Sequence, residues 1–118
     1  MVEMGREAFE ALVDEAVEMI PPKLADMVDN VAVIVEDTPP TDGPSDLLGE
    51  YIGTPVTERW GYGGIGQLPD RIMVYRLPTL AICDTPQDVV DEVVITVVHE
   101  IAHYFGIEED KLHELGWQ

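Results

Sequence analysis

Positive charges are scarce in this sequence. Six Lys and Arg stand against 24 Asp and Glu, which gives a formal net charge of -18 at pH 7. Nucleic acids and anionic membranes both attract cationic protein surfaces. We therefore expect no nucleic-acid partner and no membrane partner. Metal ions and basic peptides fit this charge, so basic peptides are the substrates to test first.

Cysteine and long apolar runs are also scarce. Cys83 is the sole cysteine, which excludes an internal disulfide, and we expect it to be a buried side chain rather than a nucleophile. No apolar run approaches the ~20 residues that cross a bilayer, and the acidic N-terminus does not look like a secretory signal. A cytoplasmic protein is the expectation. Because 46% of the 118 residues are hydrophobic, we expect residues 1–118 to form a single domain with its own core.

Hydrophobic periodicity predicts helices at both ends of the chain. Apolar side chains recur every three or four residues over positions 9–20, and the pattern stops at Pro21-Pro22. A second helix is expected to begin after Thr85, which can cap it, and to end at Gly106. This helix is apolar over most of its circumference, so we expect it to be buried. A short last helix is expected over 107–115.

Short runs rich in β-branched residues predict strands between these helices. They cover residues 31–36, 47–51 and 71–76, with a short fourth strand near 80–83. The glycine-rich stretch 61–66 is expected to be a loop, because no helix opens there as nucleotide binding would require. The order of elements indicates an α+β fold in which helices pack on a small, mostly antiparallel sheet.

The apolar helix contains the sequence His99-Glu100-Ile-Ala-His103. Two histidines four residues apart leave the same face of a helix, and they suit two ligands of one Zn²⁺ at roughly 2.0–2.1 Å. Glu100 projects about 100° around the helix from His99 and can reach a metal-bound water without being a ligand itself. Zinc lowers the pKa of such a water, and the carboxylate takes its proton. The pattern therefore predicts a zinc-dependent hydrolase.

A catalytic zinc site needs a third protein ligand. Read to Glu109, the motif is His-Glu-x-x-His-x-x-Gly-x-x-Glu, which resembles the extended metzincin motif except that metzincins end it with His. Glu109 is our first candidate, because zinc accepts a carboxylate. His113 is a better donor type and lies four residues further on, and Asp110 is the third candidate.

The stretch VVHEIAHYFGIEEDKLHELGW also resembles the C-terminus of small bacterial zincin-like proteins, which have a minimal zincin fold. Members of that family are regarded as metallopeptidases. The resemblance implies that His99 and His103 are zinc ligands, that Glu100 is the general base and that Glu109 is the third ligand. Glu at the last position departs from the Asp or His that is usual in the family, and it keeps the carboxylate.

The resemblance implies a peptide or protein substrate, which zincins align along an edge strand by β-augmentation. The strand at 71–76 is our candidate edge strand, with an inner position as its alternative. Candidate donors to the oxyanion are Tyr51, Tyr62, Tyr75 and Tyr104.

Few residues follow the predicted last helix, so we expect either a shallow site or a site that a partner or a second copy completes. This expectation motivates an alternative from another class, a zincin-like metal-binding or protein-binding module without peptidase turnover. A third hypothesis is a structural metal site, which Glu109 and His113 together would close at four ligands.

Overall fold

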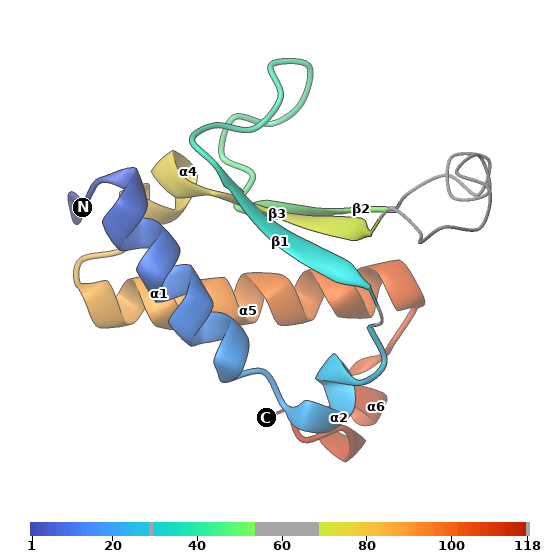
Figure 1. The fold of residues 1–118 in the computed structure, drawn as a ribbon. Coiled ribbons are helices and arrows are strands. Elements are labelled where there is room, and N and C mark those ends of the chain that lie inside the picture. Colours follow the sequence, from blue (N-terminus) through green and yellow to red (C-terminus); the bar gives the residue numbers. More distant parts are fainter. Residues whose placement is uncertain (29, 54–68, 118) are drawn as a thin grey trace.

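The computed structural model describes residues 1–28, 30–53 and 69–117. It combines helices with a three-stranded sheet, which confirms the α+β class (Figure 1). The helices are α1 (Arg6–Glu18), α2 (Pro22–Ala25), α4 (Arg76–Ala81), α5 (Pro86–Phe105) and α6 (Glu109–Glu114), and the strands are β1 (Val31–Glu36), β2 (Gly49–Ile52) and β3 (Asp70–Tyr75). The glycine-rich stretch 61–66 lies outside the described residues.

The sheet has the order β1-β3-β2, and it is mixed rather than mostly antiparallel. β1 pairs with β3 in parallel, whereas β2 pairs with β3 antiparallel. Of the two positions left open for residues 71–76, the edge position is wrong and the inner position is confirmed, because β3 is the central strand. Four consecutive residues of β3, from Ile72 to Tyr75, are buried, so both of its faces are covered. The edges of the sheet are β1 and β2.

The fourth strand expected near residues 80–83 is also wrong, because helix α4 ends there. The chain turns directly from β3 into this helix, and the Thr79 hydroxyl donates a hydrogen bond of 2.8 Å to the carbonyl of Tyr75. Pro78 lies in the first turn of α4, where a missing N–H leaves no helical hydrogen bond unmade. Apolar residues in so short a segment suit a buried helical turn as well as a strand.

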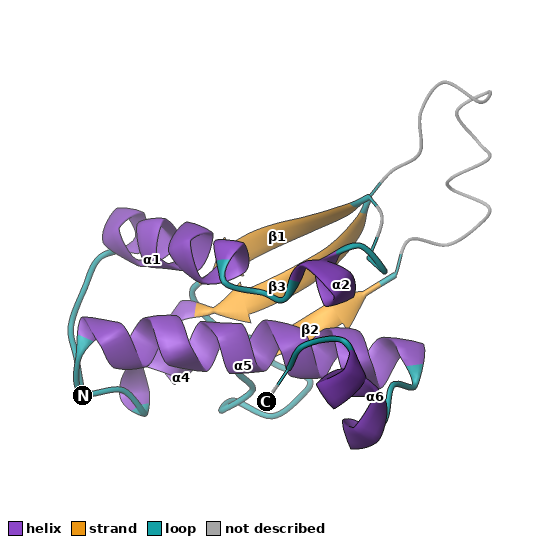
Figure 2. Ribbon diagram, turned by 90° about the horizontal axis from the view of Figure 1, so that it is seen from below, coloured by secondary structure: helices purple, strands orange, loops and turns teal. Residues whose placement is uncertain are grey.

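Helices α1 and α5 cover one face of the sheet, as seen from below in Figure 2. α5 packs against β2, β3 and α1, and its valines form much of the core with Phe9 of α1 and Val74 of β3. Within the described residues, no helix is long and apolar enough to cross a membrane.

Helix α5 begins and ends at the residues that its sequence predicts. The Thr85 hydroxyl accepts a hydrogen bond of 3.1 Å from the N–H of Asp88, and the Asp88 carboxylate accepts one of 3.2 Å from the N–H of Thr85. This reciprocal pair is a capping box. At the other end Gly106 adopts φ 65°, the left-handed conformation that closes a helix.

Cys83 lies in the core beside the start of α5 and is fully buried. Burial raises the pKa of its thiol to about 11, and the nearby carboxylate of Glu92 adds to this shift. The nucleophilic form of cysteine is the thiolate, so Cys83 is a packing residue, as expected.

Replacing Thr85 with Ala should lower the free energy of unfolding by about 1 kcal/mol, because the N–H of Asp88 loses its partner. Thr85→Ser keeps the hydroxyl and should stay within a few tenths of a kcal/mol of wild type. Urea titration followed by circular dichroism measures both. Equal stability of the Ala and Ser variants would show that the capping box contributes nothing.

Candidate functional site

The residues of the motif divide α5 into two faces. Val97, Val98, Ile101 and Ala102 are buried in the core. His99 and His103 are exposed, and Glu100 is half-buried. The helix is largely buried, as expected, but its candidate catalytic side chains leave it on the side that water can reach.

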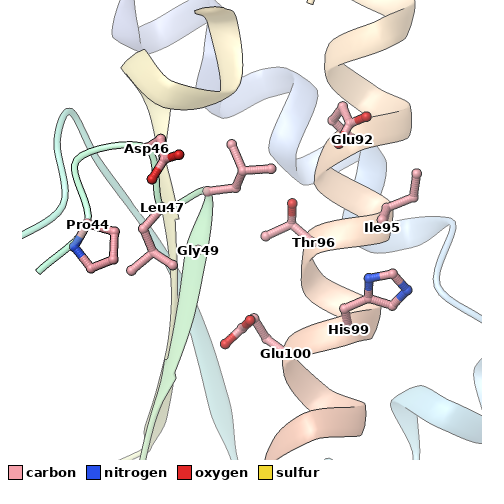
Figure 3. A pocket seen from close by; sticks show the side chains of 10 residues that line it. Pro44, Asp46, Leu47, Gly49, Glu92, Ile95, Thr96, His99 and Glu100 are labelled. Atoms are coloured by element: carbon pink, nitrogen blue, oxygen red, sulfur yellow. The ribbon is translucent and has the colours of Figure 1, made fainter. Parts of the chain in front are cut away.

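Edge strand β2 lies alongside this motif. The backbone N–H of Tyr51 donates a hydrogen bond of 3.0 Å to Oε1 of Glu100. The N–H of Tyr75 bonds to the carbonyl of Leu48, so in this antiparallel pair the N–H of Tyr51 points away from β3. Glu100 therefore binds the outer edge of the sheet, and Figure 3 shows its carboxylate directed at β2 while the His99 ring projects from α5 away from β2.

Gly49 explains how α5 and β2 come so close together. A Cβ atom at this position would lie 2.5 Å from Cγ2 of Thr96 and 2.7 Å from the carbonyl oxygen of Met73. Both distances are shorter than van der Waals contact, so only glycine fits between the helix and the central strand. This close approach brings the carboxylate of Glu100 within reach of the amide of Tyr51.

Two pockets flank Glu100, which lines both of them. One pocket, of about 430 Å³, extends toward the start of α5 and includes His99 (Figure 3). The other, of about 220 Å³, is lined by Tyr51, Glu100, His103 and Tyr104. The candidate general base thus lies between two hollows along the edge of β2.

The tyrosines predicted as oxyanion donors differ in their surroundings. The hydroxyl of Tyr51 donates to Asp70 at 2.8 Å, and its ring stacks on Tyr104 with centroids 3.9 Å apart. The hydroxyl of Tyr75 lies 3.3 Å from a carboxylate oxygen of Glu50, and burial together with Glu50 raises its pKa. Tyr51 and Tyr104 both line the smaller pocket with Glu100 and His103, and Tyr104 is the better candidate because the Tyr51 hydroxyl already donates to Asp70. Tyr62 lies outside the described residues.

The chain reverses at Gly106, as the motif predicts. The N–H of Ile107 donates to the carbonyl of Ala102 at 2.8 Å, which closes α5 and directs the chain into α6. Glu109 and Asp110 occupy the first turn of α6, and His113 lies in its last turn. Beyond α6 the Trp117 ring meets the His99 ring edge-on, with centroids 6.5 Å apart.

The described side chains provide two candidate metal ligands and do not assemble a third beside them. His99 and His103 fit zinc, because they are exposed imidazoles one helical turn apart. Across residues 1–28, 30–53 and 69–117, however, no group of three or more His, Cys, Asp or Glu side chains is arranged to hold a metal ion. The structure does not bring Glu109, Asp110 or His113 together with the two histidines, so the third ligand stays a prediction.

Two contributors to this site are missing from the sequence predictions. The amide of Tyr51 could not be found from sequence, because it depends on the pairing of β2. Glu92 lines the larger pocket and lies seven residues before His99, a helical spacing that could have indicated it.

Comparison with known proteins identifies the family. A family model described as zincin-like metallopeptidase matches residues 28–117. The chain belongs to this zincin-like family. Among solved structures, it is similar to a conserved hypothetical protein from Thermo thermophilus, with 26% sequence identity and a TM-score of 0.55 over 86% of this chain and 94% of that chain. No curated protein matches the sequence.

The turn between α5 and α6 can be tested at Gly106. Gly106→Ala should lower the free energy of unfolding by roughly 1–2 kcal/mol. The backbone at this position is left-handed, and in that conformation the Cβ atom of any other residue lies too close to the neighbouring carbonyl oxygen. Gly106→Asn should cost less, since asparagine tolerates this conformation. A Cβ atom would meet nothing within 4 Å here, so the effect isolates backbone strain from steric overlap. Thermal unfolding that ranks Ala at or above Asn would contradict this interpretation.

Proposed function

We propose that this zincin-like protein is a zinc-dependent peptidase in which Glu100 is the general base. The observation that carries the proposal is the contact between Glu100 and the outer edge of β2. An extended peptide can add to such an edge by backbone pairing. A peptide lying there would bring its carbonyl groups past the carboxylate of Glu100.

In this proposal His99 and His103 hold the metal, with Glu109 as the predicted third ligand and His113 and Asp110 as its alternatives. Bound zinc supplies an attacking water of lowered pKa and polarises the scissile carbonyl. Glu100 accepts the proton of the attacking water and passes it to the leaving amine. The Tyr51 N–H orients the carboxylate of Glu100, and the Tyr104 hydroxyl is our candidate donor to the oxyanion.

A second candidate function is a metal-binding or protein-binding module without turnover. It is favoured by the finding that the described residues do not assemble a third ligand beside His99 and His103. A structural zinc site would instead use Glu109 and His113 together. A cytoplasmic location and completion of the cleft by a partner or second copy remain predictions.

Glu100→Gln should retain zinc and lose at least roughly 10²-fold in peptidase turnover, because the amide cannot accept the proton. His99→Ala should lose zinc as well as turnover. Glu108→Gln removes the same charge at an exposed position of the extended motif to which the proposal gives no role, and it should change neither. Zinc content by mass spectrometry and cleavage of a peptide library measure the two properties. If Glu100→Gln cleaves as fast as wild type, the proposed mechanism fails.

The third ligand can be identified by zinc affinity. Glu109→Ala, Asp110→Ala and His113→Ala should be titrated with zinc against a competing chelator. We expect Glu109→Ala to weaken binding by about tenfold or more, since it removes one of three ligands, and the other two variants to stay near wild type. Weaker zinc binding by both the Glu109 and the His113 variants would favour the structural site, if X-ray absorption of the bound zinc also shows four protein ligands.

A further inference from the structure

The larger pocket beside Glu100 has a distinctive chemistry. Helix α5 contributes one wall, which includes Glu92, Ile95 and Thr96, and the start of β2 with the residues before it contributes the other. Leu47, Leu48 and Ile95 are half-buried and are among the residues that line the pocket. The pocket therefore offers apolar contact on both sides.

Three carboxylates line the same pocket, namely Asp46, Glu92 and Glu100, and no Lys or Arg is among the described residues that line it. Glu92 is half-buried on α5, and Asp46 is exposed on the opposite side. Neither of these two is among the ion pairs found in the described part of the chain, where Arg6, Arg76 and Lys111 pair with other carboxylates. Partly buried carboxylates lower their energy by pairing with a cation.

We propose that this pocket binds the Lys or Arg side chain of a peptide substrate that lies along β2. Lysine and arginine combine an aliphatic stem with a charged end. The stem fits between Leu47 and Leu48 on one wall and Ile95 on the other, and the charged end fits Asp46 and Glu92. This inference rests on the proposed peptidase function, because it names the class of peptide that the same site accepts.

The spacing along α5 indicates where the basic residue lies in the substrate. Glu92 precedes Glu100 by eight residues, which is about 12 Å along a helix. An extended peptide advances about 3.3–3.6 Å per residue. Because the long side chain covers part of this distance, the Lys or Arg is one or two residues from the scissile bond.

The pocket on the other side of Glu100 has a different lining. Tyr51 and Tyr104 form its walls together with His103, and Glu100 is the sole carboxylate among the described residues that line it. The two sides of the general base thus differ in charge, so the basic residue is recognised on the side of the scissile bond that faces Glu92. Replacing the substrate's basic residue on this side should weaken peptide binding more than replacing the substrate residue on the other side of the scissile bond.

Peptide binding tests the pocket without relying on catalysis. Fluorescein-labelled, capped heptapeptides of Ala and Ser would carry Lys, Arg, norleucine or Glu at one central position. Binding to chelator-treated protein is measured by fluorescence anisotropy at two salt concentrations. We expect Lys and Arg peptides to bind about tenfold more tightly than the norleucine peptide, which keeps the stem and lacks the charge. High salt should reduce this difference.

Variants separate the pocket from the general acidity of the protein. Glu92→Gln and Asp46→Asn should each weaken binding of the Lys peptide by about three- to tenfold. Glu15→Gln removes the same charge from the exposed face of α1 and should have no effect. Glu92→Lys should abolish the preference for the Lys peptide over the norleucine peptide, because its ammonium group neutralises one of the two remaining carboxylates. Circular dichroism of each variant verifies folding.

Three results overturn this inference: equal binding of the Lys and norleucine peptides, equal loss in the Glu15 and Glu92 variants, or no binding of the Lys peptide at millimolar concentration. Incubation of the same peptides with zinc-loaded wild type then distinguishes the two proposals. Cleavage without a Lys or Arg preference refutes the pocket and keeps the peptidase. Selective binding with no cleavage of any peptide keeps the pocket and refutes the peptidase.

Discussion

The close packing of α5 against β2 is the constraint on which the rest of the site depends. Gly49 permits it, because any side chain there would overlap Thr96 and the backbone of Met73. At this separation the carboxylate of Glu100 reaches the amide of Tyr51. The edge of the sheet and the His-Glu-x-x-His motif consequently form one continuous surface, on which the two pockets meet at Glu100.

This packing determines where the polar residues of α5 lie. Most of the helix is apolar because it packs against both the sheet and α1. Five polar residues of α5 recur at three- and four-residue spacing and line the two pockets. They are Glu92, Thr96, His99, Glu100 and His103, of which Glu100 lines both pockets. These residues form one stripe of the helix, which brings their side chains together beside the strand that a substrate would pair with.

Local signals predicted the helices and strands well. The capping box at Thr85 and the left-handed Gly106 define α5 within the chain itself, and β1 coincides with its β-branched run. The same signals failed where packing decides. The apolar segment 80–83 is too short for its sequence to distinguish a helical turn from a strand. The apolar run of β3 did not indicate whether this strand is central or at an edge of the sheet.

The sequence by itself determined the donor types, the candidate general base and the turn after the motif, because these depend on residues within a few positions of one another. Tertiary structure decided that β2 rather than β3 faces the motif, and that Asp46 and Glu92 share a pocket with Glu100. Tyr51 and Glu100 are 49 residues apart, and their contact exists only because β2 pairs at the edge of the sheet beside α5. Strand order and helix packing arise from contacts across the whole chain, which no local pattern encodes.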